Sequence, residues 1–268
     1  MKKSLAISFC AALLLTSCGE YNKVLKSTDY NYKYEYAKKA FENKRYTQAY
    51  TILEEVVNIF KGTDKAEESL YLLGLSYYEN HDYVNSASYF KNYYQHYPKG
   101  QYAELARFYS GYGYYLDSPE SQLDQTTTVK AIEELQAFLD FFPKSDKVPI
   151  AQNAIFELQD KLVKKDLENA QLYYNLGNYM GNNYESAVIT AKNALKEYPY
   201  SKYKEQLEML VLKARYREAV ESVDEKKEER FRTVIDEYYA FINDYPQSDF
   251  RKEADNIFKV ADKFVNRK

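Results

Sequence analysis

The sequence predicts an all-α chain built as an array of helix pairs. Three observations lead to this fold class. Glycine and proline are scarce, with 8 and 6 residues among 268, whereas a many-stranded β protein needs frequent turns. Small and aromatic residues recur at fixed spacings, and aromatic residues directly before proline recur where helices should end. We therefore expect about five stacked helix pairs rather than a single compact core.

The first 17 residues have the pattern of an export signal. Lys2 and Lys3 precede an apolar stretch, 5–15, which is too short to cross a membrane as a helix. The next segment, Leu15-Thr16-Ser17-Cys18, resembles the lipobox of bacterial lipoproteins, in which the cysteine is acylated and becomes the mature N-terminus. The alternative is an ordinary secretory signal with an incidental cysteine. We expect Cys18 to be the lipidated residue.

Removal of residues 1–17 changes the chemistry that remains. Cys10 leaves with the signal, so the folded part has no disulfide and no thiol nucleophile. The net charge of -3 argues against a nucleic-acid partner. The loss of two lysines changes it to -5, which argues against electrostatic attraction to anionic lipid. Residues 19–29 are polar and without a helical period, so we expect a tether that spans at most ~36 Å when extended.

A repeat begins after the tether. Ala37, Gly74 and Gly111 are spaced by 37 residues, and each has an aromatic residue three positions before it and another four positions after it. A separation of seven places both rings on one face of a helix. The pairs are Tyr34/Phe41, Tyr71/Tyr78 and Phe108/Tyr115.

A second spacing marks the other helix of each pair. Aromatic residues stand eleven positions after a small or β-branched residue, at Phe60, Tyr97, Phe142, Tyr198 and Tyr245. Proline follows four of them, and Lys61-Gly62 follows the first. Because proline cannot continue a helix, these positions predict helix ends. The predicted helices span 30–43, 46–60, 64–80, 82–97, 101–116, 125–142, 147–178, 182–197, 201–222, 225–245 and 248–266.

The segments Gly74-Leu75-Ser76-Tyr77 and Tyr83-Val84-Asn85-Ser86, followed by Phe90 and Pro98, resemble a tetratricopeptide repeat. This resemblance implies a right-handed superhelix, an α-solenoid, of about five helix pairs with a C-terminal capping helix. The third pair departs from the motif through an insertion, 116–128, and the fourth begins with an unusually long helix.

The order of these parts resembles the BamD family, the lipoproteins of the outer-membrane β-barrel assembly machine. The segment 124–131, Asp-Gln-Thr-Thr-Thr-Val-Lys-Ala, after Ser118-Pro119 supports the resemblance. It implies a lipid-anchored protein of the outer membrane that faces the periplasm. It also implies docking to periplasmic domains of a barrel-forming, BamA-like partner through the C-terminal units. The N-terminal units would contact unfolded outer-membrane proteins or accessory lipoproteins.

We divide the chain accordingly. The expected parts are a signal peptide, 1–17; a lipidated N-terminus and tether, 18–29; N-terminal units one to three, 30–145; and C-terminal units four and five with the capping helix, 146–268.

The heptad-spaced rings are the candidate binding residues. First helices of such repeats line the concave face, so Tyr34, Phe41, Tyr71, Tyr78, Phe108 and Tyr115 are predicted to form a strip that holds extended peptides. Outer-membrane strands alternate apolar and polar residues, which suits rings with hydroxyl edges. The alternative is that these rings only pack one helix pair on the next.

No motif predicts catalysis. His81 and His96 lie fifteen residues apart without cysteine partners or a zinc-binding pattern, so we expect no metal, no cofactor and no enzyme activity. The adjacent carboxylates Glu67-Glu68 and Glu133-Glu134 diverge on a helix, so they are expected to be solvated.

The run from Asp224 to Arg232 mixes both signs of charge at helical spacing. It predicts a solvated helix face or, alternatively, a partner-docking face formed by Glu228, Arg230 and Arg232.

Three functions are compatible with the sequence. The first is a scaffold for β-barrel assembly, which the resemblance favours. The second is a periplasmic tetratricopeptide adaptor that coordinates cell-envelope enzymes. The third is a glycan-binding surface lipoprotein, which the tyrosines favour and the absence of tryptophan disfavours.

Overall fold

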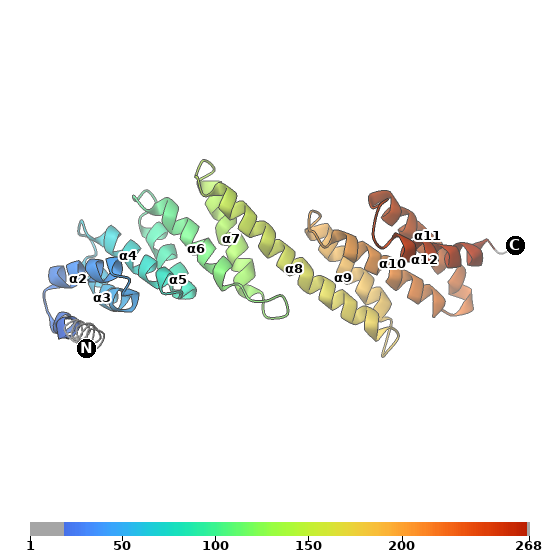
Figure 1. Cartoon of the computed structure of the whole chain (residues 1–268), viewed down its shortest axis with the longest axis horizontal. Coiled ribbons are helices and arrows are strands. Elements are labelled where there is room, and N and C mark those ends of the chain that lie inside the picture. The colour runs from blue at the N-terminus through green and yellow to red at the C-terminus, as the bar shows by residue number, and fades with distance from the viewer. Residues whose placement is uncertain (1–18, 267–268) are drawn as a thin grey trace, which may run out of the picture. The chain divides into compact units, whose positions relative to one another are not determined.

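The computed structural model describes residues 19–266, whose regular secondary structure is entirely helical (Figure 1). The predicted signal, 1–17, and Cys18 lie outside these residues. Contacts divide the chain into two compact units. The first holds the described residues to Ser118 together with Thr126–Ile155, and the second holds Pro119–Gln125 and the residues from Phe156 onward. None of the described helices is both long enough and apolar enough to cross a bilayer.

The first unit is a series of helical hairpins. From α2 to α7 each helix packs on the next along the chain, and α4 also contacts α2 and α6. The helices are α2 (Tyr30–Glu42), α3 (Tyr46–Ile59), α4 (Ala66–Glu79), α5 (Tyr83–His96), α6 (Ala103–Asp117), α7 (Thr126–Phe141) and the beginning of α8 (Val148–Leu176). The predicted helices of this part are therefore confirmed.

The second unit continues the pattern from the remainder of α8. Its other helices are α9 (Asn183–Glu197), α10 (Lys204–Val220), α11 (Asp224–Asp244) and α12 (Arg251–Val265). Five helix pairs followed by α12 make the described chain an α-solenoid of the tetratricopeptide type, as predicted. The compact units divide inside α8. The domain boundary predicted between residues 145 and 146 stays a prediction.

The aromatic residues before proline end their helices, as predicted. The Tyr198 N–H donates to the Ala194 carbonyl, and that of Tyr245 donates to Phe241, each completing a last helical turn at 2.9 Å. Three residues later the chain closes a tight turn, since the Ser201 N–H donates to the Tyr198 carbonyl at 3.2 Å. The same turn recurs after every pair, which sets the entry of the next helix.

The small residues of the repeat are points of close helix contact. A methyl group at Gly111 would lie 2.9 Å from the backbone nitrogen of Leu135, and one at Gly74 would lie 2.9 Å from the Phe90 ring. Helix backbones approach closely only where no side chain intervenes. The period of 37 residues therefore reflects packing between first and second helices.

The tether differs from the prediction. Residues 19–26 are helical, whereas an extended segment was expected. Val24 is fully buried, and the Tyr21 ring stacks on Tyr36 of α2 at 6.2 Å between ring centres. The buried Lys33 side chain donates to the Leu25 carbonyl at 3.2 Å, which satisfies one of the acceptors left at the end of this helix. The prediction of an extended tether is wrong, because these apolar contacts stabilise a helix that the sequence periodicity does not indicate.

The insertion of the third pair is attached to α8 within the second unit. Buried Ser121 donates to the Glu168 carboxylate at 3.1 Å, and Gln122 donates to the same carboxylate at 3.2 Å. Lys165 donates to the Leu123 carbonyl at 2.7 Å. These bonds hold Pro119–Gln125 against the helix and explain why contacts assign the segment to the second unit.

Candidate protein-docking pocket

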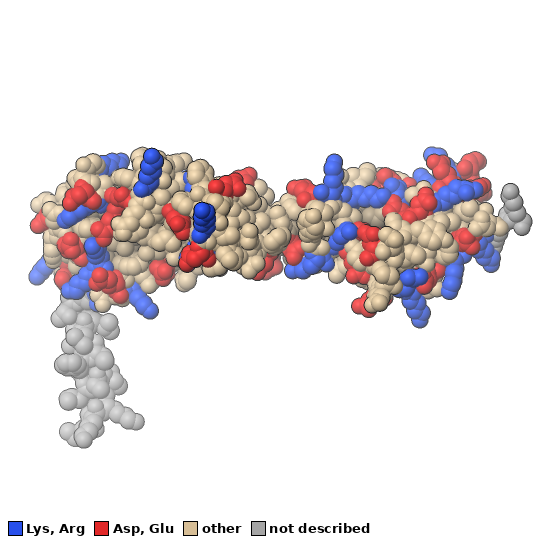
Figure 2. All heavy atoms as spheres, turned by 90° about the horizontal axis from the view of Figure 1, so that it is seen from above, with Lys and Arg blue, Asp and Glu red and all other residues tan. Residues whose placement is uncertain are grey.

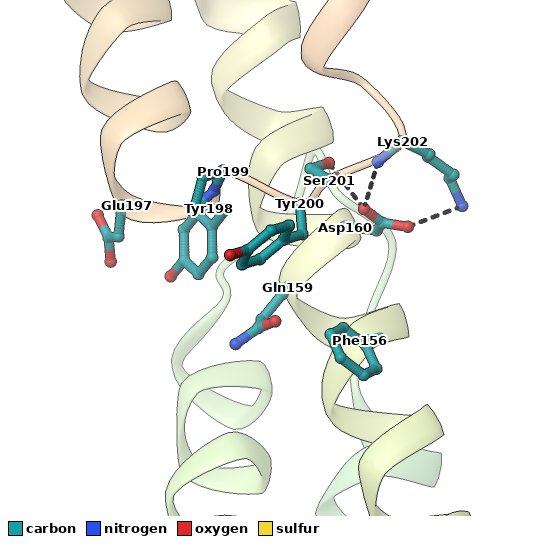
Figure 3. Close-up of a pocket in the computed structure, with 9 residues that line it drawn as sticks. All are labelled: Phe156, Gln159, Asp160, Glu197, Tyr198, Pro199, Tyr200, Ser201 and Lys202. Atoms are coloured by element: carbon teal, nitrogen blue, oxygen red, sulfur yellow. Dashed lines mark hydrogen bonds and ion pairs between the residues drawn. The ribbon is translucent and has the colours of Figure 1, made fainter.

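A surface pocket of about 470 Å³ lies in the second unit, between α8 and the turn that joins α9 to α10 (Figure 3). In Figure 3 the Tyr200 ring lies between Tyr198 on one side and the α8 side chains Gln159 and Phe156 on the other. The pocket is lined by Phe156, Gln159, Asp160, Glu197, Tyr198, Pro199, Tyr200, Ser201 and Lys202.

Asp160 fixes the turn that forms one wall. Its carboxylate accepts from the Ser201 hydroxyl at 2.7 Å and from the Lys202 N–H at 3.2 Å, and it pairs with the Lys202 ammonium at 3.4 Å. An acidic side chain holds the corresponding turn in the first unit too, where the Glu104 carboxylate accepts from Ser145 at 2.6 Å. A carboxylate therefore holds this turn in both units. In the pocket, the Asp160 carboxylate already has three donors as partners.

The rings of Phe156 and Tyr200 project from the pocket wall and are not needed to hold the turn. Tyr200 is 91% exposed and Phe156 is 58% exposed. At the position of Tyr200, two residues after the aromatic helix end, the other turns carry Gly62, Lys99, Lys144 and Gln247. The repeat therefore tolerates a small or polar residue there, and the aromatic ring of Tyr200 has no role in forming the turn.

The two carboxylates of the pocket lining have different partners. Asp160 pairs with Lys202, whereas Glu197 lies beyond Tyr198 and accepts from the Tyr198 hydroxyl (Figure 3). Burial, followed by hydrogen bonding and charge repulsion from Glu197, raises the pKa of Tyr198, so this hydroxyl stays protonated at neutral pH. Elsewhere the surface is balanced, because acidic and basic side chains mix over the visible face of each unit (Figure 2). The pocket offers apolar faces beside a local negative charge.

The predicted strip of the first unit is divided between core and edge. Tyr34, Tyr71 and Phe108 are buried, each within a cluster of side chains between helix pairs. Phe41, Tyr78 and Tyr115 are half-buried and keep some exposed surface. The first ring of each pair packs the helices, and the peptide-binding role of the strip stays a prediction.

The predicted docking face on α11 is also divided. Glu228 and Arg232 are exposed and form an ion pair along the helix at 2.8 Å. Arg230 turns inward, pairs with the buried carboxylate of Glu218 at 3.2 Å and donates to the Ser222 hydroxyl at 2.5 Å. Arg230 therefore helps to join α10 to α11. A docking role for these three residues stays a prediction.

The two histidines lie on the surface, as expected, whereas two of the carboxylates that were expected to be solvated are held by hydrogen bonds. His81 and His96 are exposed. Within the part of the chain that the structure describes, no three histidine, cysteine or acidic side chains converge as metal ligands would. Glu67 and Glu134 accept hydrogen bonds from the hydroxyls of Tyr93 and Tyr94 respectively, so these carboxylates are structural rather than merely solvated.

The pocket residues were not among the predicted site residues, although the sequence contains one signal for them. An aromatic residue at position 200 departs from the glycine, lysine or glutamine of the other four turns. Phe156, which precedes Asp160 by one turn of α8, gave no such signal.

The fold and the pocket define a class of protein. A stack of helix pairs with its apolar faces buried and rings exposed at a turn is a helical-repeat scaffold, of the kind that binds other polypeptides. Within this class, the family of outer membrane lipoproteins called YfiO matches residues 27–182. The chain belongs to this family, which is the BamD family, and the resemblance drawn from the sequence is confirmed.

Other comparisons add less. No curated protein matches the chain. Among solved structures, the TPR2AB domain in its pHSP90 complex, from yeast Sti1, is 14% identical, with coverages of 87% of this chain and 98% of that chain and a TM-score of 0.40. TPR-like repeats of a kinesin light chain from Podospora anserina are 13% identical, with coverages of 81% and 96% and a TM-score of 0.33. The fold assignment rests on the helix pairs themselves.

Proposed function

We propose that this protein is a non-enzymatic scaffold of the β-barrel assembly complex. It docks to the periplasmic part of the barrel-forming component and helps to receive and insert outer-membrane β-barrel proteins. The observation that carries the proposal is membership of an outer membrane lipoprotein family over residues 27–182. The exposed rings of the second unit support it, since a partner that covers Phe156 and Tyr200 removes apolar surface from water.

The membrane attachment is part of this proposal. Cys18, acylated after removal of residues 1–17, anchors the chain on the periplasmic face of the outer membrane, and several acyl chains on one residue hold firmly. The helical segment that begins at residue 19 packs on α2, so the first unit stays close to the bilayer. Incorporation of a labelled fatty acid should disappear in Cys18→Ser. A variant that still carries label contradicts the anchor.

The contacts of Asp160 in the pocket support a scaffold role without enzyme activity. Asp160 accepts from Ser201 and from the Lys202 backbone and also pairs with the Lys202 ammonium, so it is held as a structural anion. Such a carboxylate is poorly placed to exchange a proton with a substrate. The half-buried rings Phe41, Tyr78 and Tyr115 are proposed as the N-terminal edge that substrate segments contact.

The direct test is co-purification of the lipid-anchored chain from detergent-solubilised membranes. A large β-barrel protein in stoichiometric amount is the expected result. Cell-wall synthases in its place would favour the envelope-enzyme adaptor and overturn the proposal. Retention of polysaccharide without a protein partner would favour the glycan-binding lipoprotein and would overturn it equally.

A further inference from the structure

The helix at residues 19–26, here called the tether helix, is fixed along one side to the first unit. Val24 is fully buried in a core cluster that it shares with side chains of α2 and α3. The ammonium of Lys33 joins the end of the tether helix to α3, because it donates to the Leu25 carbonyl at 3.2 Å and to the Glu55 carboxylate at 2.5 Å. The segment is therefore part of the folded unit rather than a flexible linker.

The outer face of the tether helix, on the side away from Val24, carries only positive charge. Lys23 and Lys26 are three residues apart, so they share this face, and both are exposed. Neither lysine forms an ion pair within residues 19–266. Glu20 is the one acidic residue of the helix, and it precedes Val24 by four residues, which places it on the inner side. The outer face therefore has two cations without a counter-charge.

The two lysines lie close to the residue that carries the lipid anchor in the proposed function. Cys18 directly precedes the tether helix. A rise of 1.5 Å per residue places Lys23 and Lys26 about 6 and 10 Å along the helix axis from Gly19. Salt screens exposed charges over about 8 Å at physiological ionic strength. These lysines therefore act on a bilayer that holds Cys18, whereas most of the acidic charge of the chain is too distant to oppose them.

The bilayer surface offers the chemistry that this face lacks. Anionic phospholipid headgroups attract lysines that lie beside a membrane anchor. None of the residues on the face is large and apolar, so it suits the headgroup layer rather than the acyl chains. The face is formed by Gly19, Asn22, Lys23 and Lys26.

We propose that the tether helix lies flat on the bilayer, with Lys23 and Lys26 against anionic phospholipid headgroups and Val24 in the core of the first unit. The position of the bilayer rests on the proposed function, since it takes Cys18 to be acylated. The anchor and the two lysines then hold the first unit at the membrane in one orientation, because the tether helix packs on α2 and α3.

The test uses the full lipid-anchored chain in vesicles of phosphatidylcholine with about 30% phosphatidylglycerol. A fluorophore is attached through Thr28→Cys, which is the one free thiol once residues 1–17 are removed and Cys18 is acylated. Thr28 is exposed and follows the tether helix, so lipids with a nitroxide on the headgroup should quench the fluorophore when the helix lies flat. Quenching should be weak in pure phosphatidylcholine and should fall in about 0.5 M salt.

Variants assign the contact to the two lysines. Lys23→Gln/Lys26→Gln should lower the ratio of docked to undocked chains about thirtyfold, because each lysine near an anionic surface contributes about 1 kcal/mol. Helicity should stay unchanged, since both side chains are exposed and unpaired. Lys99→Gln/Lys144→Gln is the matched control, because it removes two exposed lysines outside the tether helix and should leave the quenching unchanged.

Equal quenching in neutral and anionic vesicles overturns the inference, as does unchanged quenching in Lys23→Gln/Lys26→Gln. Flotation with the vesicles tests the anchor separately. A chain that floats while Thr28→Cys stays unquenched in anionic vesicles overturns the inference and leaves the anchor intact, whereas a chain that does not float overturns both. Co-purification of a barrel protein tests the scaffold role independently of either result.

Discussion

The core of the first unit and the core between α8 and α10 in the second differ in their share of aromatic residues. In the first unit, rings such as Phe90 and Tyr93 are fully buried and pack consecutive helix pairs together. In the second, the core between α8 and α10 is mostly aliphatic, with Leu207, Val211 and Ala187 fully or almost fully buried. Exposed rings of the second unit include Tyr200, Tyr179 and Phe156, which are 91%, 69% and 58% exposed. The abundance of tyrosine therefore does not by itself mark a binding surface, because many of these rings are buried.

The polar links between helices differ in the same way. Tyrosine hydroxyls donate to carboxylates in the first unit, as Tyr77 does to Glu54 at 2.6 Å. The second unit instead joins α9, α10 and α11 through arginines, since Arg215 and Arg230 both pair with buried Glu218. The first unit is therefore rich in tyrosine–carboxylate hydrogen bonds, whereas the second adds a network of charges to bonds such as that from Tyr184 to Glu221.

The largest expected effect is on the aromatic core of the first unit. Phe90→Ala should lower the free energy of unfolding by about 3–5 kcal/mol, because a fully buried ring is replaced by a cavity. Denaturant unfolding followed by circular dichroism measures the change. Phe156→Ala is the matched control and should change stability by less than about 0.5 kcal/mol. A similar loss of stability in Phe90→Ala and Phe156→Ala would contradict the distinction between buried and exposed rings.

The charge network of the second unit comes next. Glu218→Ala leaves Arg215 and Arg230 without their shared carboxylate and should lower the free energy of unfolding by about 1–3 kcal/mol. The loss is smaller than for a fully buried ion pair because both arginines are partly exposed. The same unfolding experiment measures it. Glu228→Ala, which breaks an exposed pair with Arg232, is the control and should be nearly neutral. Equal effects would show that the network does not stabilise the unit.

Alkaline pH should separate the units. Burial raises the pKa of Tyr71, Tyr93 and Tyr94 in the first unit. Above pH about 10 the unfolded chain releases its phenolic protons while the folded chain keeps them. Stability is therefore complete below that pH and falls as pH rises through it. Hydrogen exchange at pH 8 to 11 should show earlier loss of protection in the first unit, and simultaneous loss in both would contradict this.

A smaller effect is expected from one hydroxyl. The Tyr93 hydroxyl donates to Glu67 and accepts from the Tyr102 N–H at 3.0 Å, so it joins α5 to the start of α6. Tyr93→Phe should lower the free energy of unfolding by about 0.5–1.5 kcal/mol, because it keeps the packing and removes the hydrogen bonds. Thermal unfolding measures the loss. Tyr179→Phe, at an exposed ring, is the control. An unchanged melting temperature in Tyr93→Phe would show that the link is dispensable.

The sequence predicted the helices because their signals are local. Proline after Tyr198 and Tyr245 marks helix ends whatever the rest of the chain does, and the spacing of Gly74 and Gly111 records close contacts within a hairpin. The helix at 19–26 was missed because it depends on tertiary contacts, the burial of Val24 and the bond from Lys33.

The division of the strip into core and edge was not predictable in the same way. A separation of seven residues places Tyr71 and Tyr78 on one face of a helix, but which of them a neighbouring helix covers depends on packing between pairs. Tyr71 stacks on Tyr102 at 4.2 Å and is buried, whereas Tyr78 lies further along α4 and stays half-buried. The pocket depends similarly on where α8 passes the turn after α9.

We propose that the exposed rings Phe156 and Tyr200 of the second unit bind the partner, whereas the buried rings of the first unit only pack its helices together. Co-purification with the β-barrel protein, paired with circular dichroism, tests this in Phe156→Ala/Tyr200→Ala against Tyr71→Ala/Phe108→Ala. The first pair should lose the barrel protein and keep its helicity and melting temperature, whereas the second should lose stability. Retention of the barrel protein by the first pair, or its loss by the second at an unchanged melting temperature, would contradict the account.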